Sequence, residues 1–327
     1  MTLPKGTSVS GLKLQPLSNG KWSGGGENLY NNVELAEKSF PQFFSGTGIS
    51  VVFKNTVRPW QLVTGNYIYI PQNAWAWHGP AKTLREFFRR NMLRVFSDCA
   101  RHRAKRVVRI GPMIPASKNC TQGYLPNTLD ESFEDALSES QKLAKVDWTP
   151  QAPYFIAPGS YWSYRRLELL INSYIGYAEG RTNPAKLVIV GPAGQQRYFK
   201  RIKQLSSSEK NICVIGRKVN RAELLSAIAL SEACVFPSAV EASPVTALEA
   251  AAVGAPIIAS DIPAHRYIET CLGGSKVNFF ASSAELKNCF SDVPKAVLSQ
   301  LSNSLYRQEQ REGWGRDLLK QCLGVSV

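Results

Sequence analysis

The sequence predicts an α/β protein made of two Rossmann-like domains, and three observations support this fold class. The chain has 327 residues, which is enough for two domains of ordinary size. Its second half alternates short apolar runs with helical segments of about a dozen residues, as βαβ units do. Several of the apolar runs end in Gly or Pro-Ser, which are common in strand-to-helix turns.

The second half is expected to be the more regular one. Its apolar runs predict strands at 153–159, 185–191, 211–216, 233–238, 255–260 and 275–280. Helical segments lie between them at 165–180, 195–205, 221–232 and 243–254. Because helices connect these successive strands, the strands should lie parallel in one sheet.

The first half is predicted to be a smaller αβ domain. Its candidate elements are a glycine turn at 24–26 before a helix from Glu27, one long helix at 82–104, and strands at 11–17, 48–53, 66–72 and 105–111. Residues 112–136 show no strong periodicity. We therefore divide the chain into a first domain at 1–148, a second domain at 149–305 and a helical segment at 306–327.

Composition narrows the class of protein. With 44% hydrophobic residues the chain can bury a sizeable core. No apolar run approaches the roughly 20 residues that span a bilayer, and the first residues contain no apolar signal region. Seven dispersed cysteines without a C-x-x-C pair indicate reduced thiols, so a cytoplasmic location is expected. With three histidines and no D-x-D triplet, we expect no metal site and no cofactor.

The chain is strongly basic. It has 39 Lys and Arg against 25 Asp and Glu, a net charge of +14. Such a surface attracts polyanions, anionic lipid or phosphorylated small molecules.

The stretch FPSAVEASPVTALEAAAVGAPIIAS at 236–260 predicts an anion site at a helix start. Ser243 suits the N-cap and Pro244 the first helical position, while Gly254 suits the residue after the helix. The first free N–H groups, on Val245 and Thr246, would face the carboxyl edge of the sheet, where ligands bind. Together with the helix dipole they can hold a phosphate.

Two glutamates flank this helix start. Glu249 lies inside the helix, and its side chain should lean back toward the helix N-terminus, where it could accept hydrogen bonds from ribose hydroxyls. Glu241, in the preceding loop, would approach the same ligand beyond its phosphates. The arrangement suits a nucleotide-sugar. The alternative is that Glu241 is a solvated loop residue and Glu249 a surface residue of the helix.

Glu-x7-Glu followed by AAAVGAPIIASD resembles the signature of the retaining, family-4 type ("group 1") glycosyltransferases of the GT-B fold. The order of elements over 153–280 matches that family. YLPNTLDESF at 124–133 resembles its Pro-Asn-Gly-Val-Asp segment, and SGGGENLYNNVELA at 23–36 resembles its N-terminal glycine loop and first helix. The resemblance implies two Rossmann-like domains facing a cleft, with a C-terminal helix that returns to the first domain.

The resemblance also implies roles for single residues. Glu241 would be catalytic, near the transferred sugar, and Glu249 would bind the ribose. The family's Gly-Arg-x4-Lys, which binds the donor pyrophosphate, aligns with the segment from Gly159 and Ser160 to Arg165. Arg165 takes the place of the lysine and can bind phosphate; a solvated arginine at a helix start is the alternative.

Ser160 cannot supply the charge of the family's arginine, so Arg166 or Arg217 would have to substitute for it. Backbone at Gly216 and Arg217 would lie against the donor base. In the first domain, the other donor residues are Gly25 and Gly26, which would bring backbone N–H groups to the phosphates or acceptor. An ordinary flexible loop is the alternative for this glycine turn.

One histidine is a candidate for the sugar or acceptor side. His78 lies in PQNAWAWHGP beside Asn73. A surface histidine without function is the alternative interpretation.

Residues 82–109 contain ten Lys and Arg against Glu86 and Asp98. Apolar residues recur there at helical spacing. Three interpretations are open: a helix with its apolar face on its own sheet, a helix lying on anionic membrane, and a nucleic-acid surface. The last is disfavoured because no nucleic-acid motif is present.

These features predict a retaining glycosyltransferase that moves a sugar from a nucleotide-diphosphate-sugar to a glycan, lipid-linked or other hydroxyl acceptor, without a metal. One alternative is a nucleotide-sugar epimerase, which would need no acceptor. The other is a non-catalytic GT-B protein that binds a nucleotide-sugar or lipid without turnover.

Overall fold

The computed structural model describes residues 50–52, 67–71, 73–81, 83–117, 121–124, 129, 131–143, 145–271 and 277–293. Several predicted features lie outside these residues: the strand at 11–17, Gly25 and Gly26 with the helix from Glu27, and the helical segment at 306–327. The expected return of a C-terminal helix to the first domain therefore stays a prediction.

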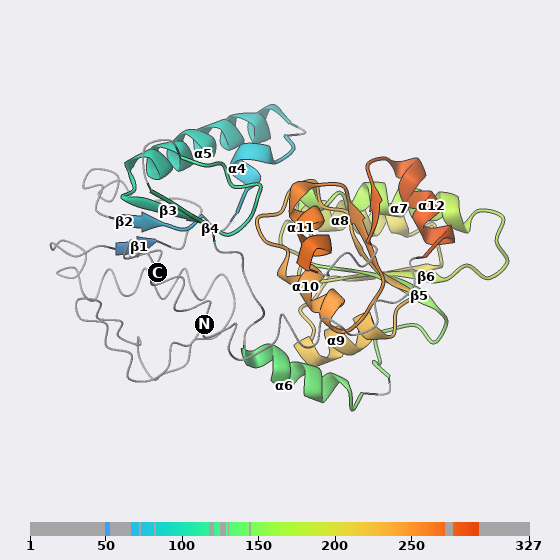
Figure 1. Ribbon diagram of the computed structural model, residues 1–327. Helices are drawn as coiled ribbons and strands as arrows, with labels where there is room; N and C mark the ends of the chain where they lie inside the picture. Colours follow the sequence, from blue (N-terminus) through green and yellow to red (C-terminus); the bar gives the residue numbers. More distant parts are fainter. Residues whose placement is uncertain are drawn as a thin grey trace.

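The second domain contains a six-stranded sheet in which all paired strands are parallel. The strand order is β10-β9-β8-β5-β6-β7 (Figure 1). The chain thus starts in the middle at β5, builds outward to β7, and then returns to build the other half from β8. This is the strand order of a Rossmann sheet. The strands are β5 (Tyr154–Pro158), β6 (Lys186–Val190), β7 (Ile212–Ile215), β8 (Ala233–Phe236), β9 (Ile257–Ser260) and β10 (Asn278–Phe280), so the six predicted strands are confirmed.

Helices cover both faces of this sheet. Successive strand residues point to opposite sides, so each strand has apolar side chains to bury on both faces. Tyr154 and Ile156 are buried on one face with residues of α9 and α10, whereas Phe155 and Ala157 are buried on the other with residues of α7 and α12. The helices are α7 (Leu167–Ala178), α8 (Gln196–Ser206), α9 (Arg221–Ala229), α10 (Val245–Ala252), α11 (Pro263–Cys271) and α12 (Ser283–Ser291). The sequence pattern predicted the first four of these helices but neither α11 nor α12.

The first domain has four parallel strands in the order β1-β2-β3-β4. They are β1 (Ser50–Val52), β2 (Tyr67–Tyr69), β3 (Arg106–Arg109) and β4 (Thr121–Tyr124), with helices α4 (Trp75–His78) and α5 (Leu84–Arg103). In the predicted irregular segment 112–136 the structure places β4 and the start of α6 (Glu131–Ser140). Strand β4 was missed because its sequence, TQGY, contains no apolar run.

Helix α6 packs with the second domain (Figure 1). Phe133 and Ala136 of this helix are buried in the core that includes Leu225 of α9, and Val146 joins the same core. The packing of the second domain therefore begins before residue 149. The exact domain boundaries remain a prediction.

The two domains touch through the loop that carries Glu241. Val240 and Ala242 of this loop are buried in a cluster with Ile68, Val108 and Ile110 of the first domain. Gly111, just after β3, lies so close to the loop that an added Cβ would be 1.5 Å from the carbonyl oxygen of Ala242. Only glycine allows this approach of the two backbones.

In the part of the chain that the structure describes, no helix is long and apolar enough to cross a membrane.

Candidate functional site

The candidate site lies where the strand order of the second sheet reverses, between β5 and β8. In open parallel sheets, the loops that leave the carboxyl ends of two such strands diverge to opposite faces, and ligands bind in the crevice between them. Ser160 and Arg165 follow β5, and Ser238 and Glu241 follow β8. The structure thus brings together predicted residues from two loops that are distant in sequence.

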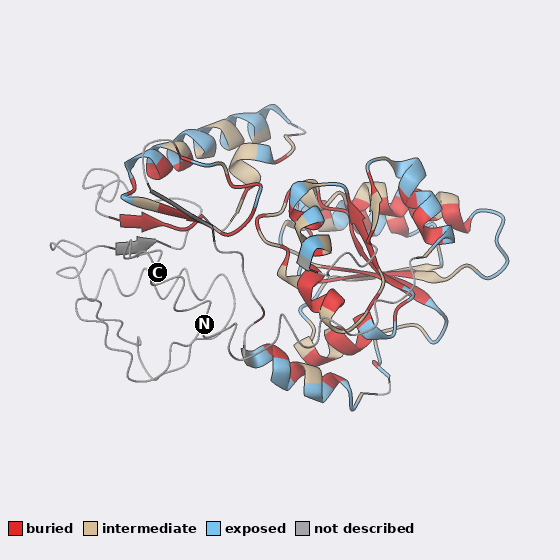
Figure 2. Ribbon diagram, viewed as in Figure 1, coloured by how far each residue is buried: buried red, intermediate tan, exposed pale blue. Residues whose placement is uncertain are grey.

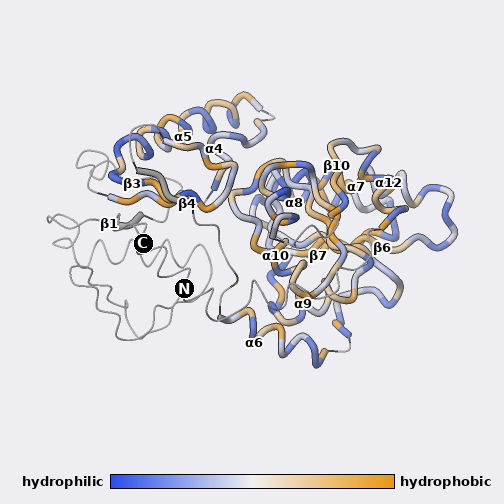
Figure 3. Tube along the Cα trace, in the orientation of Figure 1, coloured by the Kyte–Doolittle hydropathy of each residue, from blue (hydrophilic) through white to orange (hydrophobic). Residues whose placement is uncertain are grey.

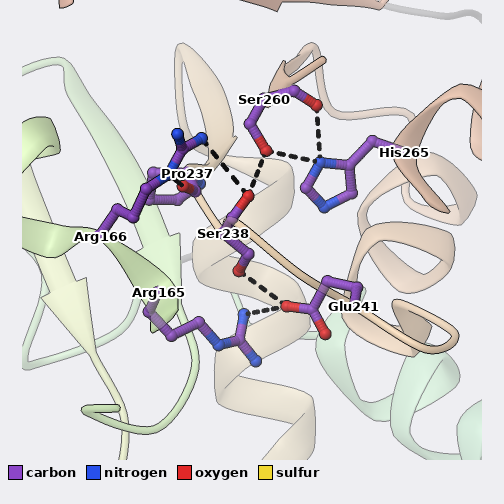
Figure 4. Close-up of polar contacts among 7 residues, drawn as sticks. All are labelled: Arg165, Arg166, Pro237, Ser238, Glu241, Ser260 and His265. Atoms are coloured by element: carbon purple, nitrogen blue, oxygen red, sulfur yellow. Dashed lines mark hydrogen bonds and ion pairs between the residues drawn. The ribbon is translucent and has the colours of Figure 1, made fainter. Parts of the chain in front are cut away.

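Arg165 and Glu241 form an ion pair at this point (Figure 4). The distance from Arg165 Nη1 to Glu241 Oε1 is 3.2 Å, and both side chains are largely buried, with 18% and 14% exposed. Glu241 Oε1 also accepts a hydrogen bond of 2.7 Å from the Ser238 hydroxyl. The carboxylate is therefore held from both loops.

The guanidinium of Arg165 lies directly over Gly159. A Cβ added to Gly159 would be 2.8 Å from Arg165 Cζ, and the backbone φ of +130° at Gly159 also requires glycine. Burial opposes the charged form of Arg165, but Glu241 and Tyr164 outweigh it and raise the pKa of the guanidinium above its ordinary value. Arg165 is therefore a permanent cation.

Arg166 does not take the place of the missing arginine. Its Nε donates to the Pro237 carbonyl at 2.7 Å, and Nη2 lies 3.5 Å from the Ser238 carbonyl. Burial lowers the pKa of this guanidinium. Arg166, in the left-handed conformation with φ of 51°, is committed to the backbone of the loop that carries Glu241. Its role here is to position that loop.

Ser260 and His265 hold the same loop from the other side (Figure 4). The Ser260 hydroxyl donates to the Ser238 carbonyl at 2.5 Å, and His265 Nδ1 lies 2.9 Å from the Ser260 carbonyl. A carbonyl only accepts, so Nδ1 carries the proton and Nε2 has a free lone pair. Burial, the largest influence, lowers the pKa of His265 below its ordinary value, so its imidazole is neutral at pH 7.

Two buried polar atoms at the site have no hydrogen-bond partner in the described structure: Nε of Arg165 and Nε2 of His265. Unsatisfied buried groups are costly, so each of these two atoms is a candidate for a hydrogen bond to a ligand or to water. No role was predicted for His265 from the sequence. Its position next to Ser260 depends on the path of α11, which the sequence pattern did not reveal.

The helix start at α10 differs from the prediction by one residue. Pro244, rather than Ser243, is the N-cap, and as a proline it makes no side-chain cap hydrogen bond. The Val245 N–H donates to the Ser243 carbonyl at 3.0 Å, so it is not free as predicted. Among the first helical N–H groups, that of Thr246 donates to no backbone carbonyl of a described residue. The predicted end of the helix is confirmed, because α10 ends at Ala252 and Gly254 has a φ of +76°.

Glu249 is buried and already paired. It is 7% exposed, and its Oε1 accepts from Arg221 Nε at 2.8 Å and Nη2 at 2.6 Å. Arg221 also donates to Ser132 of α6 at 2.6 Å. The interpretation as a solvated surface glutamate is therefore wrong. Arg221 was missed because its partner lies 28 residues away on another helix.

The other predicted residues lie as follows. Ser160 is half-buried at the end of β5, and Arg217 is exposed. A Cβ added to Gly216 would be 2.1 Å from the Phe199 ring, so the side-chain side of this residue faces an aromatic ring. In the first domain, Asn73 Oδ1 accepts from the Trp75 N–H at 2.6 Å at the start of α4. His78, at the end of α4, is exposed.

Comparison with known proteins supports the same interpretation. Residues 139–273 match the family model described as glycosyl transferases group 1. No curated protein sequence gives a significant match.

Solved structures resemble nearly the whole chain. A sucrose-phosphate synthase from Thermosynechococcus elongatus aligns with a TM-score of 0.64 at 15% identity, over 92% of this chain and 80% of that one. An α,α-trehalose-phosphate synthase (UDP-forming) from Burkholderia vietnamiensis gives 0.56 at 12% identity, over 93% and 76%. The N-terminal domain of a Candida albicans trehalose-6-phosphate phosphatase gives 0.57 at 13% identity, over 96% and 74%. Residues 139–273 are therefore similar to the group 1 glycosyl transferases, and the chain has the GT-B fold.

Proposed function

We propose that the protein is a retaining glycosyltransferase that moves a sugar from a nucleotide-diphosphate-sugar to a hydroxyl of a glycan, lipid-linked or other acceptor. The observation that carries this proposal is the Arg165–Glu241 pair at the strand-order reversal of a group 1 glycosyl transferase domain. A cation and a carboxylate side by side suit a donor whose diphosphate is negative and whose sugar becomes positive as the diphosphate leaves.

In this proposal the diphosphate lies between Arg165 and the Thr246 N–H. Arg165 has five N–H donors, and its closest contact with Glu241 uses Nη1. Glu241 lies beyond the phosphates, near the anomeric carbon, and stabilises the positive charge that develops there. Ser160 adds no charge, so the phosphates depend on Arg165, with Arg217 as the further candidate from the exposed loop after β7. Gly216 would approach the base, and Gly25 and Gly26 the phosphates or the acceptor.

Glu249 is proposed to bind the ribose, in competition with Arg221. Either Arg221 shares the carboxylate with a ribose hydroxyl, or it moves. On the acceptor side, His78 and Asn73 are the first-domain candidates. No metal ion is proposed for the transfer, and turnover should survive an excess of chelator. The proposed location is the cytoplasm, with residues 82–109 contacting the inner face of the membrane when the acceptor is lipid-linked.

The first experiment is a thermal-shift panel of the full chain with UDP-, GDP- and ADP-linked sugars and free nucleotides. UDP-sugars come first because one similar structure is described as UDP-forming. A ligand at ~100 times its Kd adds roughly 2.7 kcal/mol to the free energy of unfolding, which gives a clear rise in Tm. Stabilisation by one base class, lost in Arg165→Ala and retained in an Arg197→Ala control on α8, would support the donor site.

Product analysis then separates the alternatives. Transfer only in the presence of an acceptor, with the donor's anomeric configuration kept in the product, supports a retaining transferase. Conversion of the free nucleotide-sugar without an acceptor would indicate an epimerase, and binding without any turnover would indicate a non-catalytic protein. Inverted configuration in the product would contradict the proposed mechanism.

A further inference from the structure

Helix α5 in the first domain exposes most of the large apolar side chains on the surface of the described chain. Of the eight exposed large hydrophobic residues, six lie on α5: Leu84, Phe87, Phe88, Met92, Val95 and Phe96. Leu84 is 72% exposed, Phe88 63% and Val95 61%. The outward surface of α5 is largely exposed, whereas β2 and the middle of β3 are buried (Figure 2). A surface of this kind marks an interaction site.

The buried face of α5 is made of small and polar residues instead. Its buried residues are Ser97, Ala100 and Arg101. Arg101 donates to Asp98 at 2.9 Å and to the Ala116 carbonyl, and Asp98 also accepts from the Trp77 indole at 2.9 Å. The interpretation that α5 packs on its own sheet holds for Ala100, which is buried with Tyr67 and Tyr69, but not for the large apolar residues. The packing of Ala100 and these polar contacts hold the helix in place, and the large apolar residues are left outside.

The exposed apolar residues form a stripe bordered by arginines. Leu84, Phe88, Met92 and Val95 follow one another at intervals of four, four and three residues, so they lie on one side of the helix. Arg85 and Arg89 each follow a residue of the stripe and border it on one side, and Arg94 precedes Val95 and borders it on the other. Apolar and charged residues therefore alternate along α5 (Figure 3).

We propose that α5 lies flat on an anionic membrane surface, with this stripe inserted among the lipid headgroups and acyl chains. Arginines on the borders of an inserted apolar stripe can keep their guanidinium groups at lipid phosphates while their stems stay in the apolar layer. A second copy of the chain is a poorer occupant, because two such helices would bring arginine borders together. The net charge of +14 adds attraction to the same surface. This inference deepens the proposed contact of residues 82–109 but holds whichever sugar is moved.

The test is flotation of the full-length protein with vesicles of phosphatidylcholine alone and with 30% phosphatidylserine added, at about 0.1 M salt. The wild type should bind the anionic vesicles at least about tenfold more tightly than the neutral ones, and more weakly as salt rises. The variant Phe88→Gln/Met92→Gln should bind at least about tenfold more weakly, because it removes inserted apolar groups. The matched control is Leu230→Gln, which changes an exposed leucine of the second domain.

A second pair of variants tests the charge. Arg85→Glu/Arg89→Glu should abolish the preference for anionic vesicles, whereas Arg197→Glu/Lys200→Glu on the exposed side of α8 should leave most of it. All variants change exposed side chains, so the Tm should stay close to that of the wild type. Vesicle binding that is unaffected by either α5 variant would overturn the proposal. So would a wild-type dimer that becomes a monomer in Phe88→Gln/Met92→Gln without any vesicle binding, because the stripe would then be a dimer interface. Nucleotide-sugar binding is measured in parallel and should be the same in all α5 variants, so that failure of this proposal and failure of the proposed activity are distinguished.

Discussion

The regions around Glu241 and Glu249 contain the same chemistry in two different settings. Each glutamate is bound to an arginine, Glu241 to Arg165 and Glu249 to Arg221. The first pair joins two loops at the carboxyl edge of the sheet. The second joins α10 to the start of α9, with Arg221 reaching on to Ser132 of α6.

This difference predicts different roles for the two glutamates. A carboxylate held between loops at a ligand-binding edge can exchange partners with a ligand while the sheet and helices stay in place. A carboxylate that ties three helices together cannot be released without a cost to the fold. We therefore expect Glu241 to matter mainly for turnover, and Glu249 to matter for stability as well as for donor binding.

The largest effect is expected from Glu241→Gln. The amide keeps the size of the side chain and can still accept from Ser238, but it loses the negative charge near the anomeric carbon. Turnover should fall about a hundredfold or more, the size of loss seen when one electrostatic group of a transition-state site is removed. The measurement is kcat with the nucleotide-sugar that raises the Tm.

The Tm of the same variant serves as its control. Glu241→Gln leaves Arg165 without its counter-ion in a largely buried position, so some loss of stability is expected. Adding Arg165→Met should restore part of the stability but none of the turnover. If turnover instead returned with the Tm, Glu241 would have a structural role, and it would not differ from Glu249 in the way proposed.

A smaller effect is expected for Arg165→Ala on donor binding. Removing a charged hydrogen-bond donor to phosphate costs about 1.5–3 kcal/mol, or roughly 10- to 100-fold in Kd. Arg217→Ala, an exposed arginine of the same domain, should change Kd much less. Titration with the donor followed by calorimetry measures both. Equal losses in the two variants would mean that Arg217 binds the phosphates as strongly as Arg165 does and replaces the charge of the arginine missing at Ser160.

The sequence predicted the second sheet well because its strands are continuous apolar runs that can only be buried, such as KLVIV in β6. The family resemblance also predicted that Arg165 and Glu241 bind the same donor. In the structure the two residues meet at the edge where the parallel strands end. The sequence did not predict that Glu249 has a partner in Arg221, because such pairs depend on how α9 and α10 pack and not on local spacing.

Helix α5 shows a second limit. The spacing of Leu84, Phe88, Met92 and Val95 predicts a helix with an apolar stripe, and this is confirmed. The period is the same whether the stripe faces a sheet or the outside, so the orientation could not be predicted. In the structure it is decided by the buried contacts of Arg101 and Asp98, two residues whose charge favours an exposed position in any sequence-based assignment.

For the Glu249–Arg221 pair, Glu249→Ala should lower the free energy of unfolding by about 1–3 kcal/mol, since it removes the carboxylate that accepts from Arg221. Urea unfolding measures this loss. Arg221→Ala instead removes the arginine that is paired with the Glu249 carboxylate. If Glu249 binds the ribose, this variant should bind donor as well as the wild type or better, despite its lower stability. Weaker donor binding in Arg221→Ala than in Glu249→Ala would show that the arginine, not the glutamate, contacts the ligand.

The smallest effect is a pH dependence that belongs to the region around Glu241 alone. Burial is the main reason why the pKa of His265 is lowered. The Ser260 carbonyl and Glu241 partly offset this effect, whereas Arg165 and Arg166 add to it. The unfolded chain then binds a proton at this histidine more readily than the folded one. Its contribution to stability is present above the ordinary pKa of about 6.5 and is lost as the pH falls below that value toward the folded pKa, with a slope of at most about 1.4 kcal/mol per pH unit.

Urea unfolding at pH 7, 6 and 5 should therefore show a steeper loss of stability in the wild type than in His265→Gln. The control is His102→Gln on the exposed side of α5, which should follow the wild type. If the free energy of unfolding fell equally with pH in the wild type and in His265→Gln, the pH dependence could not be assigned to His265. Because His265 acts on Glu241 through Ser260 and Ser238, the proton that destabilises this site should also reduce turnover before the Glu249 pair is disturbed. The kcat of the wild type should therefore drop as the pH falls, and the kcat of His265→Gln should not. This result would show that the pH dependence belongs to Glu241 and not to Glu249.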